Sequence, residues 1–77
     1  MIRAYILVQT EVGASAAVTR AIRDLPGVLS AEDVAGPYDV IAHVEAPTVQ
    51  DLGRDVIAGV QAVPRITRTT TCTVVHF

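Results

Sequence analysis

The sequence Ala35-Gly36-Pro37-Tyr38-Asp39-Val40 lies between two apolar runs, residues 28–34 and 40–46, and predicts the turn of a β-hairpin. Glycine can adopt positive φ without a Cβ clash, and proline fixes its own φ and has no N–H to donate. Gly36-Pro37 is therefore expected to end one strand and to reverse the chain. Tyr38 and Asp39 then place an aromatic ring and a carboxylate at the start of an apolar strand.

Asp39 allows two interpretations. A carboxylate that enters a buried sheet is costly unless a partner compensates its charge. In the structural interpretation, Asp39 accepts hydrogen bonds from nearby backbone N–H groups, as turn aspartates often do. In the functional interpretation, it anchors a small ligand.

Length and composition predict one small globular domain, residues 1–77, that associates with other chains. Of the 77 residues, 51% are hydrophobic and 18% are charged, a balance typical of a folded chain. A chain this short buries a low fraction of its apolar surface within itself. Oligomerisation is the expected way to cover the remainder.

The charge pattern argues against direct binding to DNA. Six arginines, no lysine and eight acidic residues give a net charge of −2, and the arginines are scattered along the chain. A nucleic-acid-binding protein would cluster cations on one face. No apolar run approaches the roughly 20 residues of a membrane span, and no signal-peptide pattern follows Met1. We therefore expect a cytoplasmic protein that binds neither DNA nor membrane.

Periodicity along the chain predicts the element order β-α-β-β-α-β. Residues spaced three and four apart form one apolar stripe in each of two predicted helices, which end at Pro26 and Pro64. Gly13 and Thr48 are the expected N-caps of these helices. The predicted helices cover residues 14–25 and 49–63, and the predicted strands cover residues 2–9, 28–35, 38–46 and 65–75.

The two halves of the chain resemble each other. Pro26 and Pro64 lie 38 positions apart, and the same shift relates Val18 to Val56 and Val28 to Ile66. This repeat favours a ferredoxin-like α+β fold, in which a four-stranded antiparallel sheet has two helices on one face and strands one and three in the middle. Apolar side chains on the other face predict a dimer formed by sheet packing.

No residues have the spacing of a metal site or a catalytic centre. His43, His76 and Cys72 lack partners at helix or hairpin spacing, and zinc needs more ligands than these. Cys72, expected in the middle of an apolar strand, is interpreted as an inert thiol. The glycines are dispersed and form no phosphate-binding loop. We expect no metal, no cofactor and no enzymatic activity.

The last predicted strand carries threonine at alternate positions: Thr67, Thr69, Thr71 and Thr73. Alternation places all four hydroxyl groups on one face of the sheet. High strand propensity is sufficient to explain them. A hydroxyl-lined wall for a small polar ligand is the functional alternative.

Three segments together resemble the ligand-binding domain of the Lrp/AsnC (leucine-responsive, feast/famine) regulators. They are Leu25-Pro26-Gly27-Val28, Gly36-Pro37-Tyr38-Asp39-Val40 and the threonine-rich strand after Val63-Pro64-Arg65-Ile66. The Gly-x-Tyr-Asp turn is the family's most recognisable motif, and the resemblance extends over essentially the whole chain. Most members also carry an N-terminal helix-turn-helix domain. This sequence has none and resembles the stand-alone form.

The resemblance implies a non-enzymatic module that senses amino acids and modulates transcription regulators of the same family, including full-length members in mixed assemblies. It implies homodimers that assemble into a ring, an octamer or a decamer, with the amino acid at contacts between dimers. The ligand-binding residues that it transfers to this sequence are Gly36, Tyr38, Asp39, Thr67, Thr69 and Thr71.

Two other functions fit the sequence. One is a small dimeric ferredoxin-like enzyme of the monooxygenase or isomerase kind. Its active site would lie between the sheet and the helices, with Tyr5, His43 and Glu45 as the polar groups. The other is a purely structural oligomerisation domain.

Overall fold

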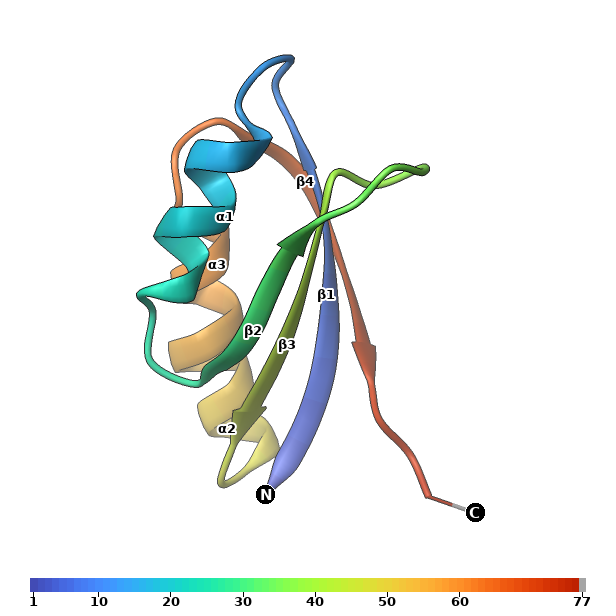
Figure 1. The fold of residues 1–77 in the computed structure, drawn as a ribbon. Helices are drawn as coiled ribbons and strands as arrows, with labels where there is room; N and C mark the ends of the chain where they lie inside the picture. The colour runs from blue at the N-terminus through green and yellow to red at the C-terminus, as the bar shows by residue number, and fades with distance from the viewer. Residues whose placement is uncertain (77) are drawn as a thin grey trace.

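The computed structural model describes residues 1–76 as one β-sheet with helices on one of its faces (Figure 1). A helical segment in the second half has three parts: α2 (Val49–Asp51), the π-helical η1 (Leu52–Ile57) and α3 (Ala58–Gln61). The predicted order β-α-β-β-α-β and the ferredoxin-like fold are confirmed. The remaining elements are β1 (Ile2–Thr10), α1 (Ser15–Arg23), β2 (Val28–Asp33), β3 (Val40–Ala46) and β4 (Ile66–Thr73).

The four strands lie in the order β2-β3-β1-β4, and every neighbouring pair is antiparallel. β1 and β3 are therefore the central strands, as right-handed crossovers predict. Successive side chains of a strand point to opposite faces. We call the face under the helices the helix face and the opposite one the bare face. The bare face carries Tyr5 and Leu7 of β1 and Ile41 and His43 of β3.

The hydrophobic core lies between the helix face and the helices. Both central strands bury alternate residues there, and each predicted helical stripe supplies buried side chains, although Leu25 and Val63 are only partly buried. The segment η1 was predicted as regular α-helix, but it still directs Leu52 and Val56 into the core. The principal core residues are Ala4, Ile6, Val8, Val18, Ile22, Val40, Ala42, Val44, Leu52, Val56 and Val60.

The capping residues agree in part with the sequence analysis. The Thr48 side chain accepts a hydrogen bond from the Asp51 N–H at 3.1 Å, as expected of an N-cap. The N-cap of α1 is Ala14 rather than Gly13, which precedes it with φ of 81°. Within residues 1–76, positive φ occurs at Gly13, Gly27 and Arg65, so Gly36 reverses the chain without it. The reason is its position before Pro37, which favours extended backbone.

The sequence repeat extends to the backbone conformation. Gly27 and Arg65 each follow a helix-ending proline, and their φ values are 84° and 73°. Arg65 keeps an exposed side chain in this left-handed conformation. At Gly27, by contrast, an added Cβ would lie 2.6 Å from Val56 Cγ2 and 2.9 Å from the Glu45 carbonyl oxygen. Position 27 therefore needs glycine because of close packing as well as positive φ.

Gly27→Ala is expected to lower the free energy of unfolding by about 2–4 kcal/mol, because it combines a left-handed φ with an overpacked contact. The measurement is urea denaturation followed by circular dichroism. Gly53→Ala is the matched control, since a Cβ at Gly53 meets nothing within 4 Å. The control is expected to be neutral or stabilising, because alanine favours helix over glycine. Equal stability of the two variants would contradict the assignment.

Candidate functional site

The loop of residues 34–39, between β2 and β3, projects toward the bare-face side of the molecule (Figure 1). Side-chain hydrogen bonds attach Pro37 and Tyr38 of this loop to the sheet. Gln9 Nε2 donates to the Pro37 carbonyl oxygen at 3.0 Å. The hydroxyl oxygens of Tyr38 and Thr70 lie 3.1 Å apart and share a hydrogen bond. The first bond reaches β1 and the second reaches β4, so two strands hold the loop in place.

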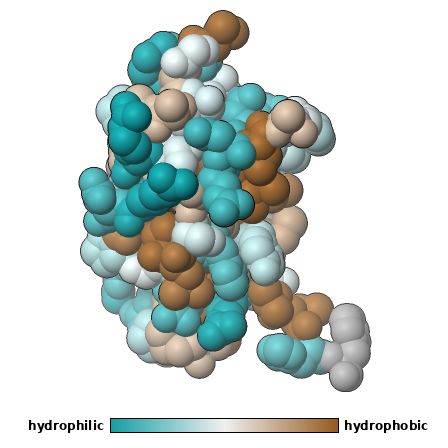
Figure 2. All heavy atoms as spheres, viewed as in Figure 1, coloured by the Kyte–Doolittle hydropathy of each residue, from teal (hydrophilic) through white to brown (hydrophobic). Residues whose placement is uncertain are grey.

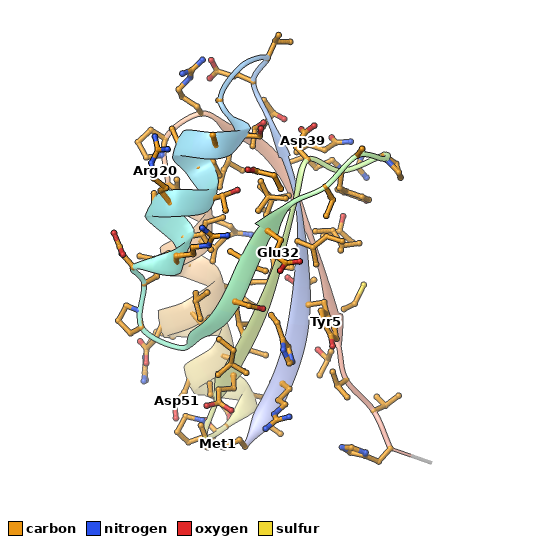
Figure 3. All side chains as sticks on the ribbon, in the orientation of Figure 1. Met1, Tyr5, Arg20, Glu32, Asp39 and Asp51 are labelled. Carbon is orange, nitrogen blue, oxygen red and sulfur yellow. The ribbon has the colours of Figure 1, made fainter. Side chains whose placement is uncertain are left out.

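Asp39 joins the loop to the end of β1 (Figure 3). Its Oδ2 accepts hydrogen bonds from the backbone N–H of Thr10 at 2.8 Å and from the Thr10 hydroxyl at 3.3 Å. Its own N–H donates to the Val8 carbonyl oxygen at 2.8 Å. Among the described residues, Oδ1 has no hydrogen-bond partner. The half-buried carboxylate therefore has a structural role through Oδ2 and a free acceptor in Oδ1.

A β-bulge interrupts the series of alternate threonines on β4. Thr69, Thr71 and Thr73 lie opposite Val8, Ile6 and Ala4, which places them on the helix face. The register then shifts between Gln9 and Thr10, so that Ile66 pairs with Thr10. Thr67 is the extra residue of this β-bulge. The bulge interrupts strict side-chain alternation at Thr67, and Thr67 nevertheless lines the same cavity as Thr69.

Thr70 is a site residue that the sequence analysis missed. It lies opposite Leu7 on the bare face, and its hydroxyl contacts Tyr38. The sequence analysis selected threonines at alternate positions, such as Thr69 and Thr71. Thr70 lies between these two residues and was therefore left out. The contact joins residues 32 positions apart, so no local pattern could indicate it.

Two cavities divide the predicted ligand-binding residues. The loop cavity, about 320 Å³, is lined by Gly36 and Tyr38 together with the apolar residues Leu7, Val34, Ala35, Pro37 and Ile41. The strand cavity, about 220 Å³, is lined by Thr67 and Thr69 together with Gln61, Ile66 and Arg68. Asp39 and Thr71 line neither. A single chain therefore does not bring the six predicted residues to one cavity.

A larger cavity of about 490 Å³ lies at the other end of the sheet, beside Gly27, Asp51 and Asp55. Its aspartates are already engaged: Arg54 Nη2 lies 2.7 Å from Asp51 Oδ1, and Arg54 Nε lies 2.9 Å from Asp55 Oδ1. The hydrogen bond from Arg54 lowers the pKa of the Asp55 carboxyl. These carboxylates are paired at the surface, and this cavity is a weaker candidate than the loop.

The bare face has a pair of aromatic side chains at its centre. The rings of Tyr5 and His43 are stacked, with centroids 4.5 Å apart and an interplanar angle of 8°. Cys72 lies opposite Tyr5 and is exposed, which corrects the expectation of an apolar surrounding. Tyr5, His43 and Glu45 all point away from the helices. The cleft between sheet and helices that the enzyme alternative required therefore lacks its three polar groups.

Within residues 1–76, no group of three or more His, Cys, Asp or Glu side chains could hold a metal ion. No helix in this part of the chain is long and apolar enough to cross a membrane.

Comparisons with known proteins agree on one family. A family model described as the Lrp/AsnC ligand binding domain matches residues 3–76. The solved structure of TTHA0845 from Thermus thermophilus is 31% identical with a TM-score of 0.91, and the match covers 100% of this chain and 96% of that one. Hypothetical protein PHS023 from Pyrococcus horikoshii is 31% identical with a TM-score of 0.89, at coverages of 100% and 93%. A search of curated proteins found no match.

A longer protein has the same fold. The transcriptional regulator NMB0573 from Neisseria meningitidis, solved as a complex with L-Met, has a TM-score of 0.73 and 16% identity. The match covers 97% of this chain and 50% of the regulator, so this chain spans about half the regulator's length.

Asp39→Ala is expected to lower the free energy of unfolding by about 1–3 kcal/mol, because it leaves the Thr10 N–H without its acceptor. Asp39→Asn should cost much less, since the amide oxygen can still accept that hydrogen bond. Urea denaturation without added ligand measures both. The control Thr10→Val removes the longer hydroxyl contact and keeps the N–H, so its effect should be small. An Asp39→Ala variant with the same free energy of unfolding as the wild-type chain would show that the Oδ2 contact contributes nothing to stability.

Proposed function

The chain belongs to the Lrp/AsnC ligand-binding domain family, and we propose that it is a non-enzymatic module that binds a free amino acid and assembles with other copies of itself. The observation that carries this proposal is the attached loop of residues 34–39. It holds the half-buried carboxylate of Asp39, whose Oδ2 accepts hydrogen bonds and whose Oδ1 has no hydrogen-bond partner within residues 1–76.

The free oxygen of Asp39 is suited to the α-ammonium group of an amino acid. Partial burial reduces the screening of the attraction between opposite charges, and an ammonium–carboxylate hydrogen bond is stronger than a neutral one. The L-Met complex of the structurally similar regulator supports this ligand class. In this proposal Oδ1 of Asp39 binds the ammonium group, and Gly36 and Tyr38 shape the loop around it.

In this proposal the threonines contact the ligand only in the assembled protein. The loop cavity and the strand cavity are separate in one chain, so an amino acid held by both would lie between two dimers. Thr67 and Thr69 then supply hydroxyl donors from the strand cavity to the ligand's carboxylate. Thr71, like Asp39, lines neither cavity, but unlike Asp39 its side chain has no hydrogen bond among the described residues, so we give it no part in this arrangement.

The assembly itself follows from the bare face. Its half-buried Leu7 and Ile41 and the exposed Tyr5 form an apolar surface beside the stacked His43. Covering it with the same face of a second copy gives a homodimer. Contacts between dimers then build a ring, an octamer or a decamer. We expect this assembly to act in the cytoplasm on full-length regulators of the same family, without binding DNA itself.

Asp39→Asn is expected to weaken amino-acid binding at least tenfold, because it removes the charge that pairs with the ammonium group. A thermal-shift screen of the twenty L-amino acids first identifies a stabilising ligand, since binding to the folded state raises the melting temperature. Isothermal titration calorimetry then compares the variant with the wild-type chain. Asp33→Asn is the matched control, because Asp33 lies on β2 near the loop and accepts a hydrogen bond from Thr19 at 2.6 Å.

Unchanged affinity in Asp39→Asn would leave Asp39 with a structural role alone. A screen in which no amino acid raises the melting temperature would contradict the sensing function itself.

Leu7→Asp is expected to convert the assembly into folded monomers, because it places a charge in the apolar centre of the bare face. Light scattering at micromolar concentration measures the mass, and circular dichroism checks the fold. Val12→Asp is the control, since Val12 is 100% exposed in the loop after β1 and lies off the bare face. A wild-type chain that is monomeric at this concentration would contradict the proposed assembly.

A further inference from the structure

The outer edge of β2 is closed by side chains of α1. Arg23 Nε donates a hydrogen bond to the Ala31 carbonyl oxygen at 2.8 Å, which occupies an outward backbone group of this edge strand. The Thr19 hydroxyl donates to Asp33 Oδ1 at 2.6 Å. Figure 1 shows α1 beside β2, and Figure 2 shows hydrophilic side chains over both elements. This edge of the sheet is therefore closed to a further strand.

The outer edge of β4 is open. The Val74 N–H donates to the Arg3 carbonyl oxygen at 2.9 Å, so these two residues form a hydrogen-bonded pair of the antiparallel ladder. Such pairs alternate along a ladder, and Cys72 and Thr70 therefore also direct their backbone groups toward β1. Within residues 1–76, no strand lies beyond β4. The residues whose N–H and C=O groups point away from the sheet are Thr69, Thr71 and Thr73.

β4 lacks the features that usually prevent strand addition. Exposed edges are commonly protected by short strands, proline, charged side chains, a bulge or a covering helix. β4 has eight residues, no proline and one charged residue, Arg68. Its bulge at Thr67 precedes the outward threonines. The three N–H and three C=O groups of these threonines are therefore presented at the spacing of a strand, a pattern that another extended backbone complements.

Arg68 indicates the chemistry of the added strand. Its side chain is exposed, and among the described residues it has no ion-pair partner. A carboxylate on a strand beside β4 would pair with it. A second copy of β4 does not supply this group, because residues 66–76 contain no Asp or Glu. The edge of β2 is closed, so the occupant is a segment of another protein.

We propose that the outer edge of β4 binds an extended, acidic peptide segment of a partner protein, which adds to the four-stranded sheet antiparallel to β4. The peptide backbone pairs with the outward groups of Thr69, Thr71 and Thr73, and its aspartate or glutamate lies beside Arg68. Thr69 lines the strand cavity with its side chain, whereas strand addition uses its backbone. The edge lies in the plane of the sheet, so this inference does not depend on amino-acid binding or on the bare face.

Hydrogen exchange tests the backbone pairing. Selection from a phage-display library of random linear peptides, with the wild-type chain as target, supplies the peptide, and we expect the selected sequences to be acidic. The amides of Thr69, Thr71 and Thr73 should exchange rapidly in the free protein and become protected when the peptide binds, because the new hydrogen bonds shield them. The amides of Thr70 and Cys72 should be protected in both states. NMR measures each amide separately.

Thr71→Pro removes one outward N–H, so it should lower peptide affinity at least about tenfold. The fold should persist, because proline is tolerated in an edge strand where the N–H faces solvent, and circular dichroism checks this. Thr71→Val is the matched control. It keeps the backbone groups and the strand propensity, so the affinity should change by less than about twofold.

Arg68→Glu should weaken the selected acidic peptides about fivefold, because it replaces an attraction across the strand pair with a repulsion. Arg20→Glu makes the same change in net charge at an exposed position of α1 and should leave the affinity unchanged. This pair of variants carries the test if Thr71→Pro does not fold.

A library that yields no peptide weakened by Thr71→Pro or by Arg68→Glu would overturn the proposal. Peptide-induced protection confined to other residues, such as the loop of residues 34–39, would overturn it as well. Protection of the Thr69, Thr71 and Thr73 amides before any peptide is added would show that a second copy of this chain covers the edge, which would also contradict the proposed partner.

Discussion

Alternation of side chains along β1 and β3 is the constraint on which the rest of this structure depends. Both strands are central, so each has a neighbour on either side and must place its even-numbered residues, such as Ile6 and Val44, against the helices. The odd-numbered residues of β1 and β3 therefore lie on the bare face. A slip of one residue in either register would exchange the two faces and expose the core.

The candidate site depends on the same two strands. β1 ends in Gln9 and Thr10, whose polar groups bind the loop that precedes β3. Because Thr10 holds one oxygen of the Asp39 carboxylate, the orientation of the other oxygen is set by the end of the sheet rather than by a flexible turn. Tyr38 extends this attachment across β1 to Thr70. A ligand at the loop would therefore contact residues that hydrogen bonds hold to β1 and β4.

The bare face connects the site with assembly. Thr70, which holds the loop residue Tyr38, belongs to the same face as Tyr5 and His43. A second sheet packed on this face would cover Thr70, and the loop cavity lies beside it, lined by Leu7 and Ile41. The proposed effector site and the proposed self-association surface therefore share Leu7 and Ile41, which would give a small module a physical route for linking the two.

Local sequence patterns determined the strands, the helices, their order and the residues of the core, because hydrophobic periodicity and helix-ending prolines act within a few residues along the chain. They also located the loop of residues 34–39 and indicated two interpretations of Asp39. Oδ2 has the structural contacts of the first interpretation, and Oδ1 is the atom to which we assign the ligand of the second. Tertiary structure alone decided the contacts that join distant segments. The bulge that displaces Thr67 arises where β4 meets Thr10, and the Tyr38–Thr70 contact joins residues 32 positions apart. Cys72 is exposed because its side chain lies on the face of β4 away from the helices. Pairing between β4 and β1 determines which residues lie on that face. The spacing of residues within one strand shows only which of them share a face.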